Sequence, residues 1–130
     1  MYTEGLMARF GYGGPAVKMQ QLKMLLRATI NALLDQGVHA DGMSESEAMA
    51  LMTQRGYQEE SEAAGKWRRA LLTSTQLSTY YVGLVEVSDT VTALKTAAPG
   101  LTERELHDRI LSYGSPPARH LRTLLQLEPV

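Results

Sequence analysis

The sequence has no cysteine, which excludes a disulfide framework, a thiolate metal site and a cysteine nucleophile. No run of apolar residues approaches the roughly 20 that are needed to span a bilayer. The first residues also lack the basic flank and the continuous apolar stretch of a signal peptide. These absences are compatible with the cytosol, and we expect a soluble, cytoplasmic protein.

Neither sign of charge is in excess. The 13 basic residues stand against 14 acidic ones, so electrostatics indicates neither nucleic acid nor an anionic membrane as a partner. A basic cluster of Lys66, Arg68 and Arg69 follows several glutamates, and Glu62 lies at the spacing of a helical ion pair with Lys66. We interpret the basic cluster as a solvated helix face.

The apolar residues recur with helical spacing from the first third of the chain onwards. Pro15 is well placed as the first residue of a helix that Gly37 stops, and this helix would be about 33 Å long. Ser44 and Glu47 form a capping box for a helix over residues 45–55. At 130 residues the chain has the size of one domain, and we expect a single domain over 1–130.

The second half continues the same pattern. Thr102 and Glu105 form another capping box, with Leu101 and Leu106 at the positions of a hydrophobic staple. We predict further helices over residues 58–72, from a break near 73–75 to about 97, over 103–112 and over 116–126. No strand pattern stands out, so the sequence predicts an all-α fold, a compact bundle of about six helices with a long central helix.

Polar and aromatic side chains interrupt the apolar pattern between Trp67 and Gly83. We expect Gln76 and Tyr80, which are four residues apart, to share one helix face with Thr73, as the wall of a site. The alternative is that these are core residues whose polar tips have partners.

Known catalytic motifs are absent. The glycines before Pro15 lack the spacing and the lysine of a P-loop, and no serine lies in a nucleophile elbow. No pair of the three histidines has the HExxH spacing, so we expect no metal ligand and no cofactor in this chain.

Several short motifs occur together in an order that carries a resemblance. They are Tyr2-Thr3-Glu4, Arg27, Asp35-Gln36-Gly37-Val38-His39, Gly42-Met43-Ser44 with Glu47 and Ala48, Gln76, Tyr80, Gly83, His107-Asp108 and Gly114-Ser115-Pro116-Pro117. In this order the chain resembles the C-terminal portion of a bacterial family called domain of unknown function eight-eight-five. Members of that family look like helical zinc metallopeptidases of the gluzincin type.

The resemblance implies that the zinc ligands and the substrate-side residues lie in different parts of a longer protein. The HExxH helix and the third, acidic zinc ligand would lie upstream, so zinc would belong to the complete protein. Tyr80 would donate a hydrogen bond to the developing oxyanion, and His39 is the second candidate for a catalytic role. Arg27 and Gln76 would bind substrate. Two structural alternatives stay open. His39 could cap the C-terminal end of its own helix, and Arg27 could pair with a carboxylate on a helix that packs against it.

Three functions follow as hypotheses. The first is the C-terminal portion of a metallopeptidase-like protein, inactive alone, with an HExxH-bearing domain or chain as partner and a peptide-like or small-molecule substrate. The second is a stand-alone helical module for binding or homo-oligomer formation. The third is a complete enzyme with His39 and Tyr80 as acid and base.

Overall fold

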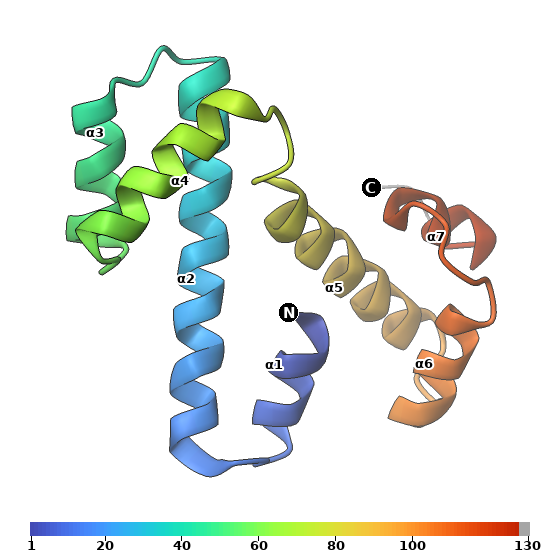
Figure 1. Cartoon of the computed structure of the whole chain (residues 1–130). Helices are drawn as coiled ribbons and strands as arrows, with labels where there is room; N and C mark the ends of the chain where they lie inside the picture. Colours follow the sequence, from blue (N-terminus) through green and yellow to red (C-terminus); the bar gives the residue numbers. More distant parts are fainter. Residues whose placement is uncertain (128–130) are drawn as a thin grey trace. The chain divides into compact units, whose positions relative to one another are not determined.

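The computed structural model describes residues 1–127, and these form helices joined by short loops (Figure 1). The described part contains no strand, which confirms the predicted all-α class. No helix within it is long and apolar enough to cross a membrane. The elements are α1 (Tyr2–Arg9), α2 (Gly14–His39), α3 (Glu45–Ala50), the π-helix η1 (Leu51–Arg55), α4 (Glu60–Leu72), α5 (Thr79–Ala97), α6 (Glu103–Leu111) and α7 (Ala118–Leu124).

The chain divides into two compact units. Unit 1 is Met1–Val82, and unit 2 begins at Gly83. Helix α5 starts in unit 1 and continues into unit 2. The expectation of a single domain over 1–130 therefore stays a prediction.

The predicted central helix is α2, and it extends two residues beyond Gly37. It contacts α1, α4 and η1, and its 26 residues correspond to about 39 Å. Gly37 does not stop the helix but stays inside it, because its missing side chain leaves room for Met43. The N–H of Met43 also donates to the Gly37 carbonyl at 2.8 Å.

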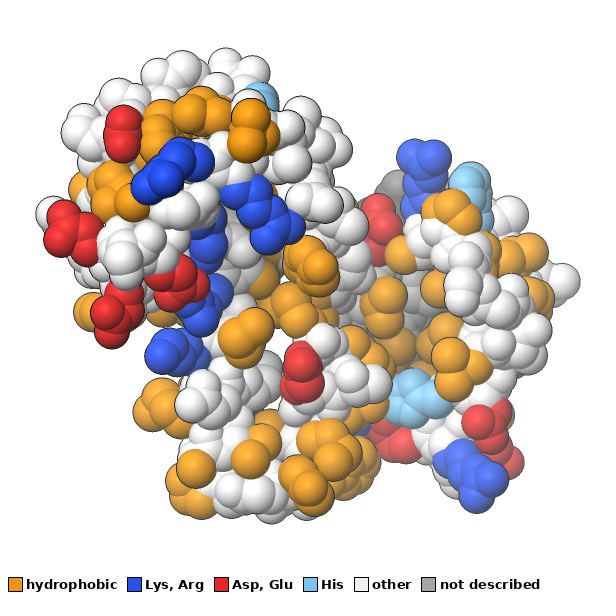
Figure 2. All heavy atoms as spheres, in the orientation of Figure 1, with side chains coloured by type: hydrophobic (Ala, Val, Ile, Leu, Met, Phe, Trp, Pro, Cys, Tyr) orange, Lys and Arg blue, Asp and Glu red, His pale blue; other side chains and the backbone are white. Residues whose placement is uncertain are grey.

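Helix α4 passes over α2 (Figure 1). Figure 2 shows Lys and Arg side chains gathered on this face, with acidic side chains beside them toward the start of α4. Of the predicted basic cluster, Arg68 and Arg69 are exposed, whereas Lys66 is half-buried. The expected ion pair of Lys66 with Glu62 is wrong, because Glu62 pairs with Arg27 of α2 instead.

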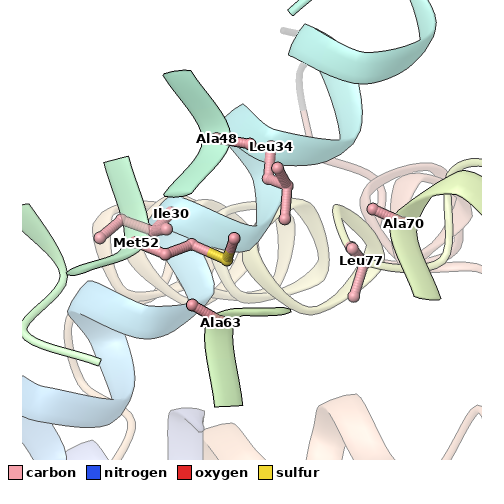
Figure 3. Packing of buried hydrophobic residues seen from close by; sticks show 7 residues of the cluster. All are labelled: Ile30, Leu34, Ala48, Met52, Ala63, Ala70 and Leu77. Carbon is pink, nitrogen blue, oxygen red and sulfur yellow. The ribbon is translucent and has the colours of Figure 1, made fainter. Parts of the chain in front are cut away.

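Figure 3 shows the core of unit 1, in which large apolar side chains meet alanines. Alanine has a small side chain, so the helices that carry these residues approach one another closely. Trp67 of α4 packs against this cluster. The buried members are Ile30, Leu34, Ala48, Met52, Ala63, Ala70 and Leu77.

Both predicted capping boxes are confirmed. The N–H of Glu47 donates to the Ser44 hydroxyl at 3.3 Å, and the Ser44 N–H donates to the Glu47 carboxylate at 2.9 Å. Thr102 and Glu105 repeat this exchange at the start of α6. Leu101 of the predicted staple packs against the core of unit 2, which consists of Leu94, Leu106, Leu121 and Leu125.

Several element boundaries differ from those expected. Helix α1 was not expected from the sequence. The break after α4 is confirmed, but it extends through residue 78, because Asp35 of α2 bonds the N–H groups of this segment. Gln76 is therefore not helical, and the predicted helix face shared by Thr73, Gln76 and Tyr80 is wrong.

Candidate functional site

A single buried carboxylate holds the segment between α4 and α5 on α2. Asp35 is 3% exposed. Its Oδ1 accepts the N–H of Thr75 at 3.1 Å, and its Oδ2 accepts the N–H and the hydroxyl of Ser78 at 3.0 and 2.8 Å. Ser78 directly precedes α5, so the Asp35 carboxylate, which comes from another helix, accepts the N–H that the N3 glutamate of a capping box would accept.

The hydrogen bonds determine the ionisation of this group. Burial alone raises the pKa of Asp35, but the bonds from Ser78 and Thr75 and the nearby His39 lower the pKa below its usual value. Asp35 is therefore an anion at neutral pH. An acidic residue in the last turns of a helix is unfavourable because of the helix dipole. This position could have indicated from the sequence that Asp35 accepts hydrogen bonds from another segment of the chain.

His39 lies beside Asp35 and caps the C-terminal end of α4. Its Nε2 is 3.0 Å from the Ala70 carbonyl oxygen, 2.9 Å from that of Thr73 and 3.7 Å from Asp35 Oδ1. Carbonyl oxygens only accept, so Nε2 carries a proton and donates it to them. His39 is thus the last residue of α2, but the carbonyls that it caps belong to the end of α4. The Nδ1 atom is the one that can accept a proton from a ligand.

A cavity of about 570 Å³ opens beside these contacts. Its lining includes Gln36, His39, Thr75, Ser78 and Tyr81, so hydroxyl, amide and imidazole groups face it together with apolar atoms. Such a cavity suits a small ligand that carries both apolar and polar groups. Within residues 1–127, no three His, Cys, Asp or Glu side chains are grouped to hold a metal ion.

The structure places Tyr80 apart from this cavity. The Tyr80 side chain is 62% exposed near the start of α5, and the lining contains its neighbour Tyr81 instead. The two predicted catalytic residues, His39 and Tyr80, therefore do not line one cavity in the described part of the chain. Ser78 and Tyr81 belong to the polar and aromatic stretch that the sequence marked as the wall of a site, but neither was chosen as a site residue.

The two predicted substrate-binding residues each have a charged partner on α4. Arg27 contacts Glu62, which is the alternative that the sequence had left open. Gln76 accepts a hydrogen bond from Arg69 Nη2 at 2.9 Å. Lys66, one turn after Glu62 on α4, interacts with the charges of Arg27 and Arg69 and donates to Gln58 Oε1 at 2.6 Å. We call Arg27, Lys66 and Arg69 the cationic cluster.

The cationic cluster changes the ionisation of its middle member. Burial, together with the charges of Arg27 and Arg69, lowers the pKa of Lys66 to about 8. Spacing along α4 could have placed Lys66 and Arg69 on one face, but it could not show that Arg27 of α2 lies against it.

The comparisons with known proteins agree with the resemblance at the level of the family. Residues 1–125 match the family described as bacterial protein of unknown function (DUF885). A solved structure from Shewanella oneidensis, provisionally described as a lipoprotein of unknown function, is 38% identical, with a TM-score of 0.89. The match covers 96% of this chain and 23% of that chain, and no curated protein matches. Because the family match spans nearly the whole sequence, the chain belongs to the DUF885 family of bacterial proteins.

Proposed function

We propose that this chain is the C-terminal helical portion of a metallopeptidase-like protein, and that it supplies residues on the substrate side. The observation that carries the proposal is the unequal coverage of the solved relative, since the match takes in 96% of this chain but 23% of the relative. A fold of this kind thus occurs as part of a much longer protein. The sequence resemblance supplies the metallopeptidase character.

The donor set of the described residues does not fit a zinc ion. No three His, Cys, Asp or Glu side chains are grouped in residues 1–127, whereas a catalytic zinc site takes three protein ligands. In this proposal any zinc is held by another portion of the protein, and the present chain is inactive alone.

Exposure of Tyr80 supports its role as a hydrogen-bond donor. A fully buried Tyr80 would count against a role at an interface with the catalytic portion, and the side chain is instead well exposed. Leu72 and Val82 are exposed as well. An exposed phenol can donate to the oxyanion of a substrate once a second portion covers it, because hydrogen bonds strengthen when water is excluded.

A groove between α1 and α2 supports a second contact with the missing portion. The groove has a volume of about 310 Å³, and Met7, Tyr12, Val17 and Met24 contribute to its lining. Phe10 between the two helices is 70% exposed. Soluble monomers rarely expose large contiguous apolar patches, so a covering portion of the longer protein is a physically reasonable occupant.

The test combines this chain with the HExxH-bearing polypeptide from the same source. Size-exclusion chromatography with light scattering measures whether a complex forms, and zinc-dependent cleavage of peptides measures activity. We expect a complex and activity that neither part has alone. Lack of both a complex and activity would show that the proposal is wrong.

Two tyrosines provide a matched pair of variants for the role of Tyr80. Removing an oxyanion donor lowers kcat by about 100-fold to 1,000-fold in known cases, and we expect Tyr80→Phe to lower activity in that direction without weakening the complex. Tyr57→Phe removes a hydroxyl from another exposed tyrosine and should leave activity unchanged. Equal activity of the two variants would remove Tyr80 from the mechanism.

The second candidate function is a stand-alone module for binding or homo-oligomer formation. The apolar groove between α1 and α2 favours it, since a second copy could cover the same surface. Light scattering on the chain alone distinguishes the two functions. A stable oligomer that is indifferent to the HExxH-bearing polypeptide would support the module.

A further inference from the structure

Lys and Arg side chains gather where α4 packs against α2 (Figure 2). Glu62, Lys66 and Arg69 are four and three residues apart, which places their side chains on one side of α4. Arg27 reaches the same side from α2, since its guanidinium contacts Glu62. The cluster is therefore built by two packed helices.

The charges within this group do not balance. Within residues 1–127, Glu62 is the one carboxylate at ion-pair distance from any of the three cations. Lys66 and Arg69 donate instead to neutral amide oxygens, those of Gln58 and Gln76. Three cations and one carboxylate leave two positive charges on a partly buried surface.

Such an excess is unfavourable without an anion, because the charges repel one another and Lys66 is partly removed from water. Lys66 also has more donors than its bond to Gln58 uses, since an ammonium carries three N–H groups. The guanidinium of Arg69 is a planar fork that fits the two oxygens of a carboxylate. The group thus offers an anion two charged donors, while Glu62 already neutralises Arg27.

We propose that Lys66 and Arg69, beside the ion pair of Arg27 with Glu62, bind a free carboxylate of a peptide. This rests on the proposed function for the peptide nature of the ligand, and it moves the main role in binding from Arg27 to Lys66 and Arg69. Gln76 holds the Arg69 side chain and acts as a positioning residue.

The test uses the full chain alone and needs neither zinc nor a second polypeptide. Acetyl-trialanine with a free C-terminal carboxylate is titrated into the ¹⁵N-labelled chain and followed by NMR. The same peptide with a C-terminal amide is the first control, and inorganic phosphate is a separate arm. We expect the free acid, but not the amide, to shift the resonances of Lys66 and Arg69 in a saturable way.

Adjacent arginines provide the matched variants. Arg68 and Arg69 are both exposed on α4, but only Arg69 belongs to the cationic cluster. We expect Arg69→Met and Lys66→Met each to weaken binding by about tenfold, because each removes a charge-assisted hydrogen bond. Arg68→Met, with the same change in net charge, should leave the affinity unchanged. The dispersion of the NMR spectrum of each variant shows whether it is folded.

Three results would overturn the inference: equal binding of the amide and the acid, equal weakening by Arg68→Met and Arg69→Met, or tighter binding of phosphate than of the peptide. Because the titration omits the catalytic portion, its failure leaves the proposed complex and its activity untouched. Conversely, binding of the free acid by a chain that forms no complex would support the carboxylate site and count against the proposed function.

Discussion

The carboxylate of Asp35 accepts both the backbone N–H and the hydroxyl of Ser78, at 3.0 and 2.8 Å, although the two residues are 43 positions apart. This contact fixes the start of α5 on α2 through a group that is almost inaccessible to water. The carboxylate also receives the Thr75 N–H, so it satisfies backbone donors that the segment between α4 and α5 leaves without a helical partner. Asp35 thus holds the segment between α4 and α5 in place, and it also contributes to the lining of the candidate cavity.

The first prediction concerns the stability that Asp35 provides. Asp35→Asn keeps the size of the side chain but turns an NH₂ group toward donors, so at least one of them stays unsatisfied. We expect a loss of about 2 to 3 kcal/mol in the free energy of unfolding, measured by urea denaturation. Asp41→Asn replaces an exposed carboxylate by an amide in the same way, and it should lower the free energy of unfolding by at most about 0.5 kcal/mol. Similar losses in the two variants would contradict the role of Asp35.

The second prediction concerns acid. The folded pKa of Asp35 is lowered below its unfolded value, which is about 3.9 for an aspartate. Its stabilisation is therefore complete above about pH 4 and is lost as the pH falls through the folded pKa, since the unfolded state then binds the proton more readily. We expect the free energy of unfolding to decrease below about pH 4, and the decrease to be smaller in Asp35→Asn. An unchanged acid profile in this variant would show that other carboxylates cause the decrease.

Two glycines give the third prediction, because an added Cβ would meet packed atoms at one of them and open space at the other. A Cβ on Gly56 would lie 2.6 Å from the Met52 carbonyl oxygen and 2.6 Å from Ile30 Cδ1, and the backbone oxygen cannot move away easily. We expect Gly56→Ala to cost about 1 to 3 kcal/mol through overpacking. Gly65 lies within α4 with open space at its Cβ position, and Gly65→Ala should stabilise the chain by about 0.5 to 1 kcal/mol. Urea denaturation of both variants measures the difference, and a stabilising Gly56→Ala would contradict the packing around η1.

The fold was predictable where short-range signals determine it. The boxes of Ser44 with Glu47 and of Thr102 with Glu105 involve residues three apart, and both helix starts lie where the sequence placed them. Gly37 shows the limit of such signals. A glycine often ends a helix, but here the packing of Met43 against it favours a longer helix.

The candidate site was less predictable because its contacts join residues far apart in sequence. Gln76 and Tyr80 have helical spacing, yet the bonds from Thr75 and Ser78 to Asp35 keep Gln76 outside the helix. Arg27 contacts Glu62 from another helix, and no spacing along one helix can show such a pair. Periodicity identifies faces of helices, whereas a site is formed by the faces that meet.

The fourth prediction concerns the titration of Lys66. We expect the ¹³Cε resonance of Lys66 to titrate with a midpoint at about 8, because burial and two neighbouring cations favour its neutral form. Arg69→Met removes one of these cations and should raise the pKa of Lys66, whereas Arg68→Met should leave it unchanged. The unfolded chain binds this proton up to about pH 10.4, so the free energy of unfolding should rise with pH between about 8 and 10.4, and Lys66→Met should remove this part of the rise. A midpoint near 10.4 in the wild-type chain would mean that Lys66 is solvated, and the electrostatic argument for an anion site at the cationic cluster would then lose its basis.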